Sequence, residues 1–444
     1  MTRVVGIINV TPDSFSDGAL YEDPRCALRH ARDLLRAGAD ELDVGGESTR
    51  PGASPVDVDE ECARVLPVIA GLRAAQIRVP VSIDTVHVQT ARRALDAGAD
   101  AINDVSGFQN PRMRALAAQS GARCIVMAPP LARAGSYAAP KEGTDAGKCA
   151  APGEAPAGFD LDTVADFLLG QASLLEQAGV ARERIALDPG FGFRDTRADD
   201  IRLFGQTPAL IARLARAGFG VYAGLSRKRF LKTLFGACSP AELDQASAEL
   251  SAVLGAAGAA FLRVHDAAST RDEICRLNAG PAQTAYVALG SNLGDCEANL
   301  RAALRWLSEL PVTTLDATAP LYLSEPAYYN DQQPFYNTVA RLRTHLGPRA
   351  LFAELQAWER LAGRVKTTPN GPRIIDMDLL SYDKFVLDTA ALTLPHPRIA
   401  QRAFVVEPLL VLDSDYRFPT GERLTRTSER YGAIIEVRPA LMPD

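Results

Sequence analysis

Short apolar runs alternate with amphipathic stretches from the N-terminus to about Leu277. The apolar runs have the length of parallel strands buried on both faces, and the amphipathic stretches place apolar residues at helical spacing. The expected strands are 3–9, 40–45, 79–84, 100–104, 122–127, 184–188, 219–225 and 260–265, and the expected helices include 26–37, 60–74, 90–97, 161–178 and 243–256. Eight repeats of this alternation predict an α/β fold of the TIM (β/α)₈ barrel type. A doubly wound open sheet is the alternative, because the pattern alone does not show closure.

The pattern changes in two places. Residues 128–160 are rich in Ala, Gly and Pro and predict a long loop after the fifth strand. Turn residues at 278–281 end the alternation, and beyond them we expect strand 284–289, helix 296–309, strands near 312–324 and 335–344, helix 348–362 and strand 374–380. This mixed order predicts an α+β domain of the ferredoxin-like kind. The expected division is a barrel at 1–278, a linker at 279–283 and a second domain at 284–444.

Composition narrows the class of protein. The chain has 444 residues, more than one core usually serves, and its 47% hydrophobic and 23% charged residues are typical of soluble globular proteins. A net charge of −6 argues against general nucleic-acid binding, and no apolar run has the length to span a bilayer. No signal peptide is recognisable, and seven scattered cysteines without a Cys-x-x-Cys pair favour a reducing cytoplasm. We therefore expect a cytoplasmic protein without nucleic-acid or membrane partners.

Polar residues follow nearly every expected barrel strand at its carboxyl end, where barrel enzymes build their sites. They include Asn9, the run 43–52, Asp84, Asn103, Asp188, the run 226–228, Arg263 and His265. Taken singly, Asp84 and Asn103 are equally well explained as helix caps, and the glycines in 45–52 as turn residues. Taken together, Arg50, Lys228, Arg263 and His265 on one rim indicate an anionic ligand such as phosphate. Buried Asp and Asn side chains suit a flat heterocycle with amino and amide edges.

Six motifs in order make residues 1–277 resemble dihydropteroate synthase. They are Asn-Val-Thr-Pro-Asp-Ser-Phe-Ser-Asp-Gly, Gly-Gly-Glu-Ser-Thr-Arg-Pro-Gly, Ile-Asn-Asp-Val-Ser-Gly, Asp-Pro-Gly-Phe-Gly-Phe, Ser-Arg-Lys and Arg-Val-His-Asp. That family joins 6-hydroxymethyl-7,8-dihydropterin diphosphate to 4-aminobenzoate and releases pyrophosphate. The resemblance implies pterin binding by Asp84, Asn103, Asp188 and Lys228, Mg²⁺ binding by Asn9, diphosphate binding by Asn9, Arg263 and His265, and an aminobenzoate pocket of Thr49, Arg50, Pro51 and Ser226.

The same resemblance implies how the reaction in the barrel proceeds. Loss of pyrophosphate leaves a pterin cation, which a nearby carboxylate would stabilise. Asp17 on the first loop is the first choice for that carboxylate and Asp13 the second. The chain departs from the family pattern at Val126–Pro130 and at Arg194-Asp195, which puts loop geometry in question rather than the reaction. Synthase barrels of this kind often form homodimers, so a homodimer through the barrel is among the expected assemblies.

Two aspartates carry the chemistry expected of the second domain. Asp376 and Asp378 stand two apart on an expected strand, so both carboxylates project from one face. Adjacent carboxylates favour a shared cation, and Mg²⁺ with nucleotide phosphates suits them. Arg364, Lys366, Arg373, Arg402 and His396 nearby carry the charge to neutralise a polyphosphate. The alternative for the pair is a solvated strand face.

Residues 284–415 resemble hydroxymethyl-dihydropterin pyrophosphokinase through Ala-Leu-Gly-Ser-Asn-Leu-Gly-Asp, Gln-Gln-Pro-Phe-Tyr-Asn, Gly-Pro-Arg-Ile-Ile-Asp-Met-Asp and Leu-Pro-His-Pro-Arg. That family moves a diphosphate from ATP to the pterin hydroxymethyl group and releases AMP. The resemblance implies two Mg²⁺ ions on Asp376 and Asp378, pterin contacts from Phe335 and Asn337, and ATP contacts from Gln356, Glu359, His396 and Arg402. Arg364 and Arg373 would serve the phosphates or the closing loop, where Lys366 and Asn370 replace an arginine and a tryptophan common in the family.

The two resemblances together predict a bifunctional enzyme of folate synthesis whose second half makes the substrate of its first. Its partners would be small molecules: 6-hydroxymethyl-7,8-dihydropterin, ATP and 4-aminobenzoate. Two alternatives stay open. One is a barrel methyltransferase that binds reduced pterins, and the other is a pterin-binding regulator with one or both sites inactive.

Overall fold

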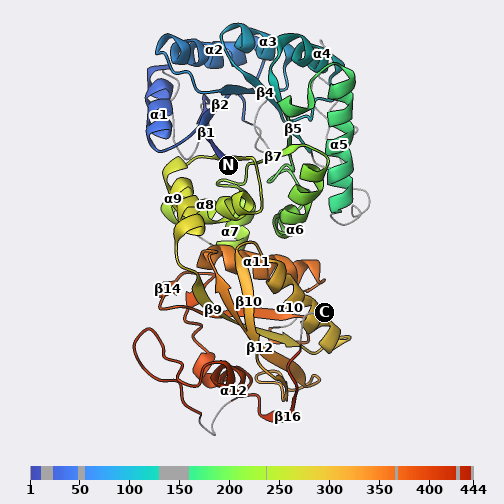
Figure 1. Ribbon diagram of the computed structural model, residues 1–444, viewed down its shortest axis with the longest axis vertical. Helices are drawn as coiled ribbons and strands as arrows, with labels where there is room; N and C mark the ends of the chain where they lie inside the picture. The colour runs from blue at the N-terminus through green and yellow to red at the C-terminus, as the bar shows by residue number, and fades with distance from the viewer. Residues whose placement is uncertain are drawn as a thin grey trace. The chain divides into compact units, whose positions relative to one another are not determined.

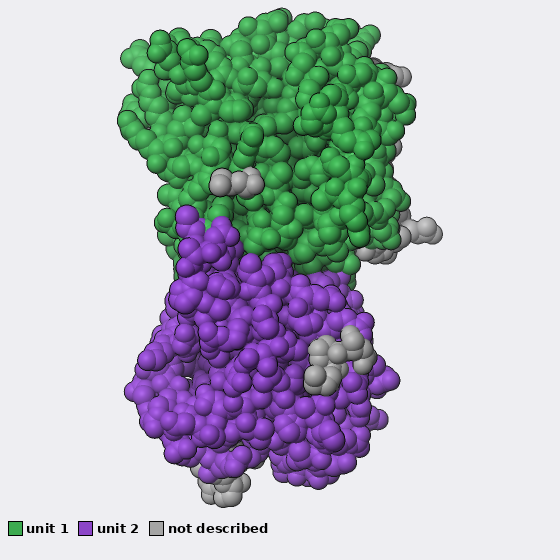
Figure 2. Space-filling view, viewed as in Figure 1, with its two compact units in different colours: residues 1–229, 239–274 green, residues 230–238, 275–444 purple. Residues whose placement is uncertain are grey.

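The computed structural model describes residues 2–11, 24–48, 56–129, 160–236, 238–365, 369–426 and 431–441. The chain forms two compact units, which are coloured separately in Figure 2. One unit holds residues 1–229 and 239–274, and the other holds residues 230–238 and 275–444. Among the described helices, none is long and apolar enough to cross a membrane.

Eight parallel strands of the first unit close into a barrel (Figure 1). They are β1 (Arg3–Asn9), β2 (Glu41–Gly45), β3 (Val81–Asp84), β4 (Ala101–Asp104), β5 (Arg123–Met127), β6 (Ile185–Asp188), β7 (Gly220–Ala223) and β8 (Phe261–Val264). β1 pairs with β2 on one side and with β8 on the other. Closure confirms the predicted barrel and excludes the open sheet.

Helices follow the strands and surround the barrel. They are α1 (Pro24–Arg36), α2 (Val58–Ala74), α3 (Val88–Asp96), α4 (Pro111–Ser120), α5 (Leu161–Gln177), α6 (Arg197–Arg216), α7 (Arg229–Phe235), α8 (Pro240–Ala256) and α9 (Ala267–Ala279), with a short 3₁₀ helix at Arg182–Arg184. Local polar residues start several of them: Asn110 caps α4, Thr196 caps α6, and Ser239 and Glu242 form a reciprocal capping box at α8.

The inside of the barrel changes from apolar to charged along the strands. Val5, Ala101, Ile125, Ala186 and Tyr222 form a buried cluster, with Phe261 packed against it. Alternate residues of a strand face the same side, so the positions two residues beyond Ala101, Ala186 and Phe261 also point inward. These positions are Asn103, Asp188 and Arg263. The apolar cluster therefore supports polar groups at the carboxyl ends of the strands.

The second unit is built on one antiparallel sheet with strand order β13-β9-β12-β11-β16, and β10 also pairs with β12. Its elements are β9 (Gln283–Ser291), α10 (Cys296–Glu309), β10 (Thr313–Thr318), β11 (Leu321–Ser324), β12 (Phe335–Thr344), α11 (Pro348–Leu361), β13 (Asp376–Tyr382), a hairpin of β14 (Leu387–Asp388) and β15 (Thr393–Leu394), a 3₁₀ helix at Ile399–Gln401, α12 (Ala403–Leu412) and β16 (Ile434–Arg438). From β9 to β13 the order is β-α-β-β-β-α-β, which is the β-α-β-β-α-β order of the predicted ferredoxin-like fold with its second strand divided into β10 and β11, both paired with β12.

Helices cover this sheet from two sides. Tyr286 of β9 packs with Val405 and Leu409 of α12 in one buried cluster. The neighbouring residues Ala285 and Val287 are buried on the opposite face. α10 packs against β9 and α11 against β13, and a stacked pair of Trp306 and Trp358, with ring centroids 5.0 Å apart, joins these two helices. The core of the unit therefore lies on both faces of the sheet.

Candidate functional site

Three charged side chains and one amide, from four strands, meet inside the barrel at the carboxyl ends of the strands. The carboxylate of Asp43 on β2 accepts hydrogen bonds from Arg263 Nε on β8 at 2.6 Å and from Asn103 Nδ2 on β4 at 3.3 Å. Arg263 Nη2 also donates to Asp84 on β3 at 3.0 Å. The structure therefore brings together Asp84, Asn103 and Arg263, three residues that the sequence assigned to one ligand.

Asp84 and Asn103 do not cap helices. α3 begins at Val88 and its N-cap position is His87, while the cap of α4 is the side chain of Asn110. Because both helices start elsewhere, the capping explanation of these two residues is wrong. Their side chains are instead used inside the barrel.

Lys228 and Asp188 complete the charged set. Lys228 Nζ lies 4.6 Å from the ring centroid of Phe193, and its charge interacts with that of Asp188. Gly192 has φ +81°, and a Cβ at this position would lie 2.7 Å from Lys228 Cδ. Glycine at 192 therefore allows Lys228 to pack against the loop after β6.

Burial shifts the pKa values of these groups. Burial raises the pKa of Asp84 to about 7, with Arg263 opposing the shift and Asp43 adding to it. Burial likewise raises the pKa of Asp188 to about 6, although the Gly190 amide donates to it at 2.7 Å. Burial, helped by Arg263, lowers the pKa of Lys228 to about 8. Clustered shifts of this size inside a barrel mouth are typical of a working site.

Two residues with different expected roles touch at the same rim. Ser226 Oγ lies 3.0 Å from His265 Nδ1, and the His265 amide donates to Ser226 Oγ at 3.2 Å. The expected aminobenzoate and diphosphate positions are therefore adjacent here. Asn9 stands at the end of β1 and is half-buried. Asp13, Asp17, Thr49, Arg50 and Pro51 lie outside the described residues.

The two departures from the family pattern are in contact with each other. Arg194 Nη2 donates to the carbonyl oxygens of Ala128 and Pro129 at 2.6 and 2.9 Å. The arginine is buried, so these bonds join the end of β5 to the loop after β6. The altered residues therefore form one local arrangement next to Asp188.

Sequence reasoning assigned no role to Asp43 or Phe193. Phe193 lies inside the motif Asp-Pro-Gly-Phe-Gly-Phe used for the resemblance, whereas Asp43 stands between Leu42 and Val44, two residues before the motif that begins at Gly45. The alternation of inward positions along β2 is the signal that selects Asp43, because Glu41, Asp43 and Gly45 face the same side.

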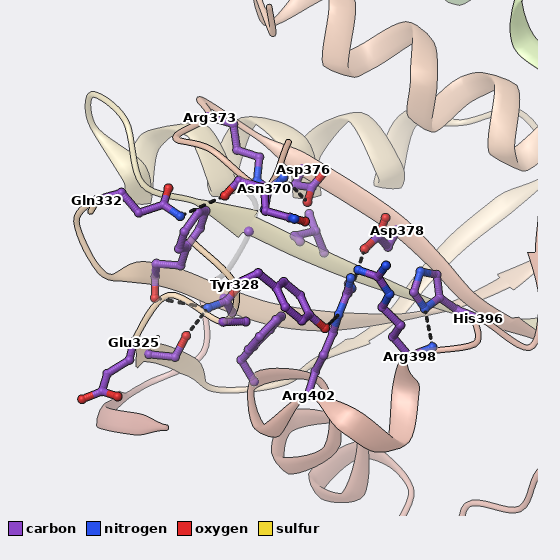
Figure 3. Close-up of a pocket in the computed structure, with 18 of the residues that line it drawn as sticks. Glu325, Tyr328, Gln332, Asn370, Arg373, Asp376, Asp378, His396, Arg398 and Arg402 are labelled. Carbon is purple, nitrogen blue, oxygen red and sulfur yellow. Dashed lines mark hydrogen bonds and ion pairs between the residues drawn. The ribbon is translucent and has the colours of Figure 1, made fainter. Parts of the chain in front are cut away.

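The second unit contains a cavity of about 390 Å³ lined by most of the residues predicted for its site. Phe335, Asn337, Arg364, Arg373, Asp376, Asp378, His396 and Arg402 all line it. Figure 3 shows Asp376 and Asp378 on one strand, with Arg373 near the first and Arg402 reaching the second. The sequence-predicted set is thus largely gathered in one place.

Each aspartate of the pair is held by arginine. Asp376 forms ion pairs with Arg364 at 2.6 Å and with Arg373 at 3.3 Å, and Asp378 pairs with Arg402 at 3.0 Å. Burial and the neighbouring Asp378 raise the pKa of Asp376. Burial opposes the charge of Asp378 too, but Arg402 and His396 outweigh it and lower its pKa. These are partly buried carboxylates in a cavity, not a solvated strand face.

Gln356 and Glu359 do not line the cavity. Glu359 is buried on α11, where its carboxylate accepts from the Met377 amide at 2.8 Å, pairs with Arg364 and accepts from Gln356 Nε2 at 3.0 Å. Glu359 therefore holds Arg364 and the start of β13 in place without lining the cavity itself.

Tyr328 and Arg398 are among the further residues that line the cavity, and no role was predicted for either. The guanidinium carbons of Arg398 and Arg402 lie 5.2 and 5.8 Å from the ring centroid of Tyr328, and Tyr328 and Arg402 are also joined by a 3.4 Å hydrogen bond (Figure 3). Tyr328 thus faces two cations across the opening. The tyrosine lies in an irregular loop, where neither periodicity nor a motif distinguishes it.

The described residues contain no cluster of three or more His, Cys, Asp or Glu able to hold a metal ion. The Asp376–Asp378 pair nevertheless fits Mg²⁺, because this ion commonly takes one or two protein carboxylates and completes its shell with phosphates and water. Asn9 is the predicted ligand of Mg²⁺ in the barrel, and its side chain can give the ion one amide oxygen.

Comparisons with known proteins point to the same two activities. A family model described as "Pterin binding enzyme" matches residues 5–265, and one described as "7,8-dihydro-6-hydroxymethylpterin-pyrophosphokinase (HPPK)" matches residues 286–414. The dihydropteroate synthase of Synechocystis sp. is 36% identical over 277 residues, which cover 62% of this chain and 89% of that protein. A probable bifunctional folylpolyglutamate synthase/dihydropteroate synthase of Haloferax volcanii is 39% identical over 269 residues, 60% of this chain and 29% of that protein.

Solved structures agree with the barrel. The Xanthomonas albilineans dihydropteroate synthase with 4-aminobenzoic acid has a TM-score of 0.53 and 37% identity, covering 63% of this chain and 93% of its own. The Burkholderia cenocepacia enzyme complexed with 7,8-dihydropteroate has a TM-score of 0.52 and 36% identity, covering 63% and 91%.

Proposed function

Since residues 5–265 make this chain a member of the pterin-binding enzyme family and residues 286–414 add a pyrophosphokinase domain, we propose that it catalyses two consecutive steps of folate synthesis. In the first, the second unit transfers a diphosphate from ATP to 6-hydroxymethyl-7,8-dihydropterin and releases AMP. In the second, the barrel joins the pterin diphosphate to 4-aminobenzoate and releases pyrophosphate. The observation that carries the proposal is that each unit gathers one set of charged groups suited to a pterin and its phosphates.

In the barrel, the pterin would lie among Asp84, Asn103, Asp188 and Lys228. The two carboxylates and the amide match the amino and amide edges of the ring. Arg263 and His265 would face the diphosphate, because they are the cationic or ionisable groups at the same mouth. The bond between the methylene carbon and the diphosphate oxygen breaks and leaves the pterin cation, the arylamine nitrogen forms a bond to that carbon, and the nitrogen then loses a proton. This weak nucleophile needs placement next to the carbon. We retain Asp17 and Asp13 as candidates for stabilising the cation, with Thr49, Arg50, Pro51 and Ser226 around the aminobenzoate.

In the second unit, the pterin hydroxymethyl oxygen attacks the β-phosphorus of ATP, the bond to the α-phosphate oxygen breaks, and the hydroxyl proton is lost. Phe335 and Asn337 would hold the pterin, and His396 and Arg402 the nucleotide. A bound Mg²⁺ would supply charge neutralisation on the phosphates. Asp376 and Asp378 would hold it, and Arg364, Arg373 and Arg402, now paired with these carboxylates, would turn to the phosphate oxygens.

Further features of the protein belong to the same proposal. We keep the domain division at 279–283 as a proposal, because α9 ends at Ala279 and β9 begins at Gln283, while the two compact units divide at residues 274 and 275 and place residues 230–238 in the second unit. The described cysteines form no disulfide, which supports the proposal of a cytoplasmic location. A homodimer through the barrel is also proposed. Light scattering of the purified protein should then give the mass of two chains.

A two-stage assay tests the proposed reactions. The protein is incubated with ATP, Mg²⁺ and 6-hydroxymethyl-7,8-dihydropterin, and AMP and pterin diphosphate are measured. 4-Aminobenzoate is then added, and dihydropteroate and pyrophosphate are measured. Both product pairs are expected. Products in neither stage would favour a binding protein, and methyl transfer to or from a reduced pterin would favour the barrel methyltransferase.

A further inference from the structure

We propose that Asp43 is a positioning residue of the synthase site, which holds Arg263 and Asn103 where they meet the pterin diphosphate. The inference rests on the proposed function of the barrel and extends it to a residue outside the expected ligand set. Asp43 is fully buried on β2.

Both oxygens of the Asp43 carboxylate accept hydrogen bonds from side chains of the site. Oδ2 accepts from Arg263 Nε at 2.6 Å and from Asn103 Nδ2 at 3.3 Å, while Oδ1 accepts from the hydroxyl of Ser82. Ser82 lies on β3, two residues before Asp84. One buried carboxylate thus connects four strands, and two of its three partners are expected to contact the ligand.

Arg263 shows what this arrangement does. Asp43 and Asp84 take different nitrogens of its guanidinium, Nε and Nη2, so the plane of the group is set by two carboxylates. The side chain of Asp84 is 13% exposed and that of Asp43 is 0% exposed. Asp84 is therefore accessible to a ligand, whereas Asp43 is not and affects the ligand only through Arg263 and Asn103.

A purely stabilising ion pair is the competing explanation, because buried pairs often contribute little to a site. The two explanations differ in what they predict for the pKa of Asp84. Asp84 faces Arg263, Asp43, Lys228 and Glu61, and the negative charge of Asp43 raises the pKa of Asp84. Removing this charge without changing the shape of the residue should make Asp84 ionise at lower pH.

The test is Asp43→Asn in the full chain, with Tyr222→Phe as the matched control. Tyr222 is buried in the apolar cluster of the barrel, burial and the charge of Asp43 raise its pKa and keep it neutral, and its hydroxyl has no hydrogen-bond partner among the described residues. Asp43→Asn should raise KM for the pterin diphosphate about tenfold, by loss of about 1.4 kcal/mol of binding, and change KM for 4-aminobenzoate by less than about twofold. The acid limb of the pH profile should move down by about one pH unit. Tyr222→Phe should leave both measurements unchanged.

A second readout does not need turnover. Carboxyl ¹³C NMR of aspartate-labelled protein, assigned with Asp84→Asn, follows the ionisation of Asp84 in the free enzyme. Its midpoint should fall in Asp43→Asn. An unchanged midpoint together with unchanged KM would overturn the proposal. A lowered midpoint in Asp43→Asn, together with a wild-type protein that makes no dihydropteroate, would instead overturn the proposed function and keep the electrostatic link.

If Asp43→Asn does not fold, Ser82→Ala replaces it. This variant removes the hydroxyl that holds Oδ1 and leaves every charge in place. KM for the pterin diphosphate should rise about threefold, or about 0.7 kcal/mol, because Asp43 keeps its charge and its bonds to Arg263 and Asn103 but loses one of the hydrogen bonds that hold it. Wild-type KM values in a folded Ser82→Ala protein would count against the positioning role.

Discussion

The guanidinium of Arg227 and the carboxylate of Asp244 form a two-pronged ion pair, with Nε to Oδ1 at 2.6 Å and Nη2 to Oδ2 at 2.9 Å. Arg227 stands between Ser226 and Lys228 and has φ +55°, a left-handed conformation that is uncommon for a residue with a side chain. Its amide also donates to Ser247 Oγ at 3.0 Å. Two contacts with α8 therefore hold a strained residue whose two neighbours face the barrel site.

Asp244→Asn is expected to lower synthase kcat/KM about tenfold, because the loop carrying Ser226 and Lys228 loses its anchor. Kinase turnover of the same preparation should not change. Asp162→Asn is the matched control, since it removes another Arg–Asp pair, with Arg213 at 2.5 Å, on the exposed side of α5. A synthase loss equal in both variants would show that the loop is not held through Asp244.

The synthase reaction should have a bell-shaped pH dependence. Below about pH 7 Asp84 takes up a proton and stops accepting hydrogen bonds as a carboxylate, so kcat/KM rises as pH rises through this value. Above about pH 8 Lys228 loses its charge, so kcat/KM falls. The measurement is initial-rate kinetics from pH 5 to 10 with the pterin diphosphate limiting. A flat profile between pH 6 and 9 would contradict the assignment of both groups.

Asp376→Asn and Asp378→Asn should each lower kinase turnover about 10³-fold, because each removes a carboxylate proposed to hold Mg²⁺, a contribution of about 4 kcal/mol. The synthase supplied with ready-made pterin diphosphate is the internal control and should keep its rate. Magnesium titration of kinase activity adds a second check, since the variants should need more Mg²⁺. Full kinase activity in either variant would exclude that residue from the metal site.

Glu359→Gln separates direct contact with ATP from support of Arg364. The structure buries Glu359 behind the cavity, bonded to the Met377 amide and paired with Arg364. Loss of its charge should lower kinase kcat about tenfold by releasing Arg364, while Kd for a non-hydrolysable ATP analogue changes less than about threefold. Calorimetric titration measures the second quantity. A large loss of nucleotide affinity with unchanged kcat would restore the contact with ATP predicted from the sequence.

Much of the fold was predictable because buried parallel strands leave a continuous apolar run. The predicted strand 3–9 coincides with β1, and the predicted strand 122–127 differs from β5 by one residue at its start. In the second unit, one predicted strand near 312–324 is two, β10 and β11, separated at residues 319 and 320. β10 and β11 both pair antiparallel with β12 and so run in the same direction, and the break between them falls at Pro320, which has no amide hydrogen to give to the sheet.

The site was predictable where a rule of geometry connects sequence to space. Strand ends meet at one face of a barrel, so Asp84, Asn103, Asp188 and Arg263 could be assigned together. The rule did not separate Gln356 and Glu359 from the residues that line the cavity of the second unit. Helical spacing places a residue on a face of α11, but the neighbours of that face come from β13 and from Arg364 beyond the helix.

The sequence alone determined the order of strands and helices and the polar residues at the strand ends, because these follow from the spacing of apolar and polar positions, whereas closure of the sheet into a barrel came from the tertiary structure. Only the tertiary structure decided how the charges are paired and which of them are buried. Asp43 and Arg263 are 220 positions apart, and closure of the barrel between β1 and β8 brings their side chains to 2.6 Å. Coulomb energies and desolvation depend on distance and burial, so the pKa values of Asp84 and Lys228 are properties of the closed barrel rather than of any segment of the chain.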